Sequence, residues 1–122
     1  MPVAALDHIN ISTDKLAETR AFFVELLGLT EGDRPPFGFP GHWLYIGGHP
    51  IVHLVGRPKG RLPSHEAALD HFALRADGYD ELKLKLDDAG LTYSAVDVPG
   101  RATRQIFVDD PNGVTVELNF PG

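Results

Sequence analysis

The chain has 122 residues, no cysteine and a formal net charge of −6 at neutral pH. A hydrophobic share of 43% and a charged share of 23% are typical of an ordinary globular protein that buries a core. The lack of cysteine excludes disulfides and thiolate chemistry, and we expect one cytoplasmic domain over residues 1–122. The acidic balance argues against nucleic acid as a partner, and no apolar run has membrane length.

The first predicted element is a strand over residues 6–12, where polar and apolar residues alternate. Asp14 is the expected N-cap of a helix whose apolar residues form one stripe, and Gly28 is its expected end. A loop rich in proline and glycine follows. Two further strands, "HWLYIG" and "IVHLVG", are predicted on either side of a Gly-Gly turn.

The second half of the chain begins the same pattern again with a strand over residues 69–75. Asp77 is the expected cap of a helix that ends at Gly90. Its stretch "ELKLKL" also fits an alternating strand, but the cap, the stop glycine and the matching helix in the first half favour a helix. Three strands are predicted to close the chain, at residues 92–98, 103–108 and 114–120, with the turn "DPNG" before the last.

The second half predicts the order βαβββ, and we expect the same order in the first half. The segment "LDHINIS" returns sixty-three residues later as "LDHFALR", and the helix ends and fourth strands keep nearly the same offset. A repeat this long in a short chain indicates two similar modules related by an approximate two-fold axis. The expected fold class is α+β, with modules 1–62 and 63–122 forming a curved mixed sheet, or cup, with helices outside.

Polar residues recur on one face of this sheet, because alternate residues of a strand share a face. His8 and His71 occupy the same position in the two copies of the first strand, opposite an apolar face. His53 and Glu117 occupy equivalent positions in the two copies of the fourth strand. A two-fold axis would bring these two pairs towards one centre.

This combination favours a metal site over a structural polar cluster, which is the alternative interpretation. An inward carboxylate without a partner costs several kcal/mol, and the pattern places no inward lysine or arginine that obviously neutralises Glu117, Arg75 being the nearest candidate. Two imidazoles and one carboxylate form a facial triad that leaves open positions for substrate or water. The set suits Fe(II), Mn, Ni, Co or Zn.

Four residues are candidates for substrate contact. Ile106 and Val108 fit the apolar face that packs against the helix. Gln105 and Phe107 alternate with them and should therefore face the cup, although Gln105 also fits a plain surface role. Asn119 shares the face of Glu117. Trp43 either lines an apolar wall of the cup or packs in the core.

These features resemble the vicinal oxygen chelate superfamily, which includes glyoxalase I, fosfomycin-resistance proteins, epimerases, extradiol dioxygenases and bleomycin-binding proteins. The resemblance covers nearly the whole chain, and "VDDPNGVTVELNF" is similar to the family ending "DPxGxxxEL". It implies metal ligands at His8, His71 and Glu117. Where glyoxalase I has a carboxylate and epimerases a glutamine, this chain has His53, which is then a fourth ligand, a neighbour of the ligands or a general base.

The resemblance implies a metal-dependent enzyme that chelates vicinal oxygens of a small-molecule substrate, and a homodimer. His53 and Glu117, if labile, are the candidate catalytic bases. Two alternatives stay open: a protein that binds a drug or metabolite without chemistry, and an Fe(II) dioxygenase that cleaves an aromatic diol. The metal triad distinguishes the enzyme from the first alternative, because a protein that only sequesters a ligand does not need metal ligands.

Overall fold

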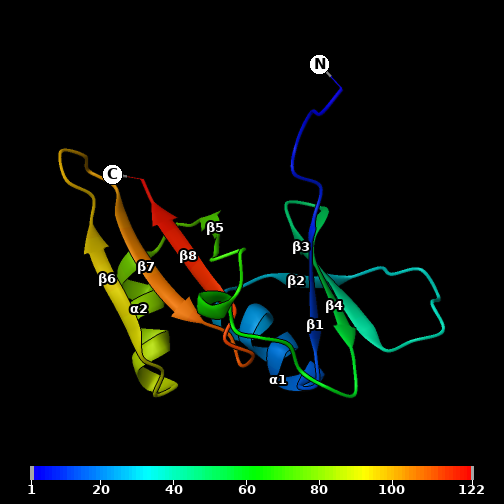
Figure 1. The fold of residues 1–122 in the computed structure, drawn as a ribbon. Coiled ribbons are helices and arrows are strands. Elements are labelled where there is room, and N and C mark those ends of the chain that lie inside the picture. The colour runs from blue at the N-terminus through cyan, green and yellow to red at the C-terminus, as the bar shows by residue number, and fades with distance from the viewer. Residues whose placement is uncertain (1, 122) are drawn as a thin grey trace. The chain divides into compact units, whose positions relative to one another are not determined.

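The computed structural model describes residues 2–121, which divide into two compact units with the boundary between Arg61 and Leu62 (Figure 1). The first unit contains β1 (Ile9–Thr13), α1 (Leu16–Ala21) with a π-helical continuation (Phe22–Leu26), β2 (Thr30–Gly32), β3 (Gly41–Ile46) and β4 (His49–Gly56). All three residues of β2 are exposed, and a strand this short shows no alternation in the sequence.

The second unit repeats this order. It contains a 3₁₀ turn (Ser64–Glu66), β5 (Phe72–Arg75), α2 (Tyr79–Asp88), β6 (Tyr93–Asp97), β7 (Arg104–Asp109) and β8 (Thr115–Phe120). The three closing strands were each predicted to within one residue at both ends. No helix in the described part of the chain is both long and apolar enough to span a membrane.

Each unit builds one four-stranded mixed sheet. The strand order is β1-β4-β3-β2 in the first unit and β5-β8-β7-β6 in the second. In both units the first strand runs parallel to the last, and the remaining pairs are antiparallel. The prediction of two βαβββ modules is therefore confirmed.

The first helix begins differently from the prediction. Asp14 is not its N-cap, because the helix begins after Lys15 and has no side-chain cap. The Lys15 amide instead donates to the Thr13 hydroxyl at 2.8 Å, while the Asp14 carboxylate lies 3.7 Å from the Lys15 ammonium. The predicted end is confirmed, since Gly28 directly follows the last residue of the π-helical continuation and its cap.

The segment "ELKLKL" is helical, as predicted, and its helix α2 ends at Asp88, with Ala89 as the C-cap directly before Gly90. Asp77 is not its cap. The capping position is Gly78, whose φ of 74° lies in the left-handed region that glycine adopts without a Cβ clash. Leu82 and Leu86 are buried from α2, which agrees with the predicted apolar stripe.

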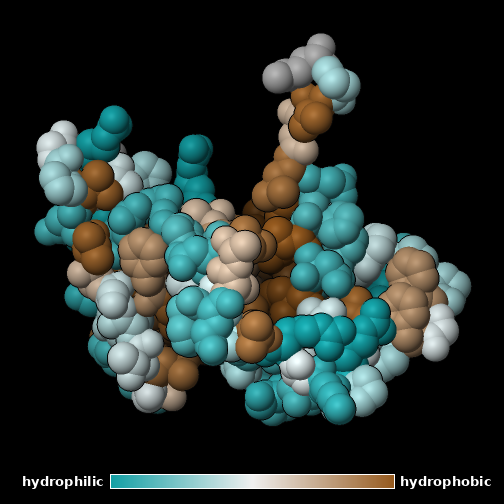
Figure 2. All heavy atoms as spheres, viewed as in Figure 1, coloured by the Kyte–Doolittle hydropathy of each residue, from teal (hydrophilic) through white to brown (hydrophobic). Residues whose placement is uncertain are grey.

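Both first strands begin three residues later than predicted. The register Ile9↔Val52 places Pro50 opposite Asp7, and proline has no amide hydrogen with which to extend the pairing. Leu6 is 68% exposed, and the segment before β1 is the brown strip at the top of Figure 2. Leu69, its counterpart before β5, is 71% exposed.

Each sheet has an apolar face and a polar face, as predicted. Val52 and Leu54 of β4 are fully buried, and α1 lies against this strand. In the second unit Val116 and Leu118 are buried, and the ring of Phe120 meets Tyr79 of α2 edge-on with centroids 5.3 Å apart. The helix in each unit thus covers the apolar face, and the alternate residues of β4 and β8 point away from it.

Candidate functional site

Four polar side chains of the second unit form a cluster on the face opposite α2. His71 Nε2 lies 3.2 Å from Glu117 Oε1. Glu117 Oε2 accepts hydrogen bonds from Gln105 Nε2 at 3.1 Å and from Asn119 Nδ2 at 2.7 Å. The register Gln105↔Asn119 places these two amides beside the carboxylate. Four of the residues predicted for the site therefore lie together.

The Glu117 side chain is about 10% exposed, so its charge is largely removed from water. Two amides and one imidazole surround it, and within residues 2–121 no lysine or arginine forms an ion pair with it, Arg75 included. An imidazole nitrogen and a carboxylate oxygen at 3.2 Å repel each other unless a cation lies between them. That cation is either a proton on His71 or a metal ion.

The surroundings of His71 favour its protonated form when no metal is present. The hydrogen bond from the ring to Asp70, together with the nearby Glu117 charge, raises the pKa of His71 above its ordinary value of 6.5. Two ligand atoms about 2.1 Å from one ion and at right angles around it lie about 3.0 Å apart. The separation of 3.2 Å between His71 Nε2 and Glu117 Oε1 fits two neighbouring metal ligands.

The first unit has a stack of three rings at the equivalent place. The His53 ring lies between His8, with centroids 3.8 Å apart and planes 12° apart, and Trp43, at 4.1 Å and 11°. Trp43 is half-buried on the polar face rather than packed in the core. The registers Asn10↔His53 and Ala73↔Glu117 confirm that His53 and Glu117 hold equivalent positions.

His53 has a defined hydrogen-bonding state. Its Nε2 lies 3.1 Å from the Pro50 carbonyl oxygen, which only accepts, so Nε2 carries the hydrogen and Nδ1 carries the lone pair. Burial, and next the charge of His8, lower the pKa of His53 below 6.5. The ring is therefore neutral near pH 7 and has a free basic nitrogen.

Two aspartates were missed by the sequence analysis. Asp7 Oδ2 lies 2.6 Å from His8 Nδ1, and Asp70 Oδ2 lies 2.8 Å from His71 Nδ1. The repeated "LDH" was the signal that would have identified them. Among residues 2–121 no group of three or more potential ligand side chains stands ready to hold a metal. His71 and Glu117 form a pair in the second unit, and His8 belongs to the first.

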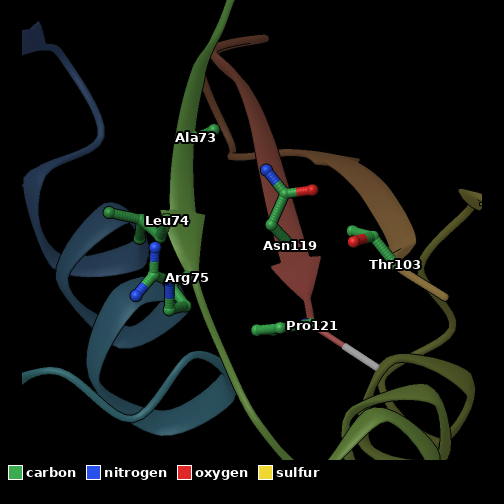
Figure 3. Close-up of a pocket in the computed structure, with 6 residues that line it drawn as sticks. All are labelled: Ala73, Leu74, Arg75, Thr103, Asn119 and Pro121. Carbon is green, nitrogen blue, oxygen red and sulfur yellow. The ribbon is translucent and has the colours of Figure 1, made fainter. Parts of the chain in front are cut away.

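A cavity of about 410 Å³ opens in the second unit next to this cluster (Figure 3). Figure 3 shows the Asn119 amide from β8 and the Thr103 hydroxyl just before β7, on one side of β5. Arg75 contributes a charged side chain to the lining. The volume lies within the range of small-molecule sites. Phe107 meets the His71 ring edge-on with centroids 5.8 Å apart.

Comparison with known families agrees with this architecture. The model of the Glyoxalase/Bleomycin resistance protein/Dioxygenase superfamily matches residues 5–118. The chain belongs to this superfamily. The resemblance noted in the sequence is thereby confirmed, while no curated protein sequence gives a significant match.

Several solved structures share this fold. A glyoxalase family protein from Bacillus anthracis is 23% identical, with a TM-score of 0.75, and the match covers 98% of this chain and 97% of the other. A fosfomycin resistance protein from Listeria monocytogenes is 16% identical, with a TM-score of 0.77 and coverage of 98% and 95%. An antibiotic binding protein from a Streptomyces species is 20% identical, with a TM-score of 0.71 and coverage of 100% and 99%.

Proposed function

We propose that this protein is a metal-dependent enzyme that binds two neighbouring oxygens of a small-molecule substrate at a divalent cation. The ligands in this proposal are His8, His71 and Glu117. The observation that carries it is the approach of His71 Nε2 to Glu117 Oε1 at 3.2 Å, around a nearly buried carboxylate that no lysine or arginine of the described residues neutralises. His8 is the repeat equivalent of His71 and supplies the third ligand.

The chain's own residues have distinct roles in this proposal. A divalent ion held by His8, His71 and Glu117 would supply Lewis-acid stabilisation of negative charge on the substrate oxygens. Gln105 and Asn119 hold the Glu117 carboxylate in place, and Asn119 also reaches the cavity, where it contacts substrate. Phe107 supplies an apolar wall beside His71, and Trp43 supplies one beside His53.

His53 is the proposed general base. It is neutral near pH 7, and its Nδ1 lone pair is free to accept a proton. Glu117 is the second candidate base, if it leaves the metal during the reaction. His53 is not needed to complete a triad of two imidazoles and one carboxylate.

Metal analysis of protein purified without added metal, followed by calorimetric titration, tests the ligand set. The alanine variants of His8, His71 and Glu117 should each lose metal binding, whereas His53→Ala should keep most of it. Fe(II), Mn, Ni, Co and Zn are the ions to titrate. Parent-like binding by His8→Ala or His71→Ala would remove the main support for the proposal.

The third ligand is supplied either within one chain or across a homodimer. β1 and β5 are the outermost strands of their sheets, and an outermost strand offers unpaired amides to a second subunit. Neither His8→Ala nor Glu117→Ala chains should bind metal alone. A mixture of the two regains bound metal only if one site takes ligands from both chains, so the metal content of mixed dimers distinguishes the arrangements.

A drug- or metabolite-binding protein without chemistry is the second candidate. The cavity in the second unit has both polar and apolar residues in its lining, and the first unit has a stack of three flat rings, which suits a ligand with aromatic parts. In that case ligand binding would be unchanged after the metal is removed with a chelator. An Fe(II) dioxygenase is a specific form of the first candidate, and it predicts oxygen uptake with aromatic diols only in the iron-loaded protein.

A further inference from the structure

The same side-chain contact occurs in both copies of the repeat, directly before the first strand. The Asp7 carboxylate lies 2.6 Å from His8 Nδ1, and the Asp70 carboxylate lies 2.8 Å from His71 Nδ1. Each pair uses the same atoms, Oδ2 and Nδ1, and each joins neighbours in the sequence. The histidine in each pair, His8 or His71, is a proposed metal ligand.

These contacts decide which ring nitrogen carries the hydrogen. An ionised carboxylate only accepts hydrogen bonds, so Nδ1 must be the donor in both pairs. A neutral imidazole has one N–H, which leaves the lone pair on Nε2. For His71 the contact with Asp70 at 2.8 Å is shorter than the approach of Glu117 to Nε2 at 3.2 Å, so the hydrogen stays on Nδ1. In this neutral form the lone pair is on Nε2, where a metal ion can take the place of the proton that the charged ring holds beside Glu117.

We propose that Asp7 and Asp70 are positioning residues that hold His8 and His71 with Nε2 open towards the metal. The proposal rests on the proposed function for its metal, but the hydrogen position is a property of the metal-free chain. His53 is an internal reference, because its Nε2 donates to a carbonyl and its lone pair is on Nδ1. The chain thus holds the two proposed ligand rings in one tautomer and the proposed base in the other.

Orientation, rather than stability, is the expected contribution of both aspartates. Their side chains are 78% and 74% exposed, and exposed ion pairs add little to the free energy of unfolding. Their substitution should therefore leave the fold intact. Partners that orient a ligand histidine typically contribute about 10- to 100-fold to metal affinity.

The first experiment measures tautomers in the metal-free protein. Long-range ¹H–¹⁵N spectra at a pH where all histidines are neutral, assigned with single His→Gln variants, should show Nδ1–H for His8 and His71 and Nε2–H for His53. Asp7→Leu and Asp70→Leu should each shift the following histidine towards the Nε2–H form. Asp→Asn variants should keep Nδ1–H, because the amide oxygen still accepts from the ring. An Nε2–H tautomer at His8 or His71 in the parent protein would overturn the proposal.

The second experiment titrates Co²⁺ or Zn²⁺ into the same variants by calorimetry. Asp7→Leu and Asp70→Leu should weaken binding by about 10- to 100-fold, whereas the Asp→Asn variants should stay within a few-fold of the parent. Asp97→Leu is the control, since Asp97 is an exposed carboxylate on β6. Parent-like affinity in the Leu variants refutes the positioning role. A parent that binds no metal refutes the proposed function instead, and the spectra still report whether the aspartates set the tautomer.

Discussion

The turn before β8 provides a quantitative test of the structure, because one buried carboxylate holds it. Asp110 is 5% exposed. Its Oδ1 accepts hydrogen bonds from the amides of Asn112 at 2.8 Å and Val114 at 2.9 Å, and its Oδ2 accepts one from the Asn112 side chain at 3.1 Å. The turn precedes the strand that carries Glu117, which gives the "DPNG" motif its structural role.

Asp110→Ala should lower the free energy of unfolding by about 2–4 kcal/mol, since it removes three hydrogen bonds worth about 1 kcal/mol each and leaves half-buried amides unpaired. Asp110→Asn should cost less than about 1 kcal/mol, because its side-chain oxygen still accepts both backbone hydrogen bonds. The Asn112 amide then rotates to present its oxygen to the new NH₂ group.

The difference in the free energy of unfolding between the parent and Asp110→Asn also depends on pH. Burial raises the pKa of Asp110 above its ordinary value of 3.8, so the folded protein holds this proton more tightly than the unfolded chain does. That contribution to stability is present below pH 3.8 and is lost as the pH rises through the raised pKa. Asn does not titrate, so Asp110→Asn should gain stability relative to the parent as the pH rises towards 7.

Urea unfolding of the metal-free protein, followed by circular dichroism at two pH values, measures these differences. If Asp110→Asn and Asp110→Ala lower the free energy of unfolding equally, the charge of Asp110, rather than the position of its acceptor oxygens, holds the turn. A loss below about 1 kcal/mol for Ala would refute the three hydrogen bonds as its main support.

Three further predictions concern the turn and the histidines. Gly113→Ala should be destabilising in the same urea assay, because Gly113 has a φ of 81° and an added Cβ would lie 2.6 Å from the Pro63 Cβ. Apparent metal affinity, measured by calorimetry across a pH series, should fall on acidification through the raised pKa of His71, because the proton competes for Nε2; a flat profile would exclude His71 as a ligand. The fluorescence of the single tryptophan should be quenched as His53, stacked on it at 4.1 Å, becomes protonated below pH 6.5, and His53→Gln should abolish this step.

The sequence by itself determined the two modules, the polar and apolar faces, and the pairing of His53 with Glu117 as equivalent positions. These features follow from alternation with a period of two and from a repeat, and both are visible without tertiary contacts. The terminal "DPNG" turn was also identified correctly, because its geometry is set by its own residues.

The tertiary structure decided where the first strands begin and what caps the helices. It also decided which ring nitrogen carries the hydrogen in His8, His53 and His71. The start of β1 depends on register, which places Pro50 opposite Asp7, and the two residues are far apart in the sequence. The roles of the aspartates depend on which ring nitrogen each carboxylate reaches, and the lone pair of His53 depends on a carbonyl three residues away. A residue pattern states which side chains share a face, whereas hydrogen bonds depend on distances of a few ångströms that only the folded backbone sets.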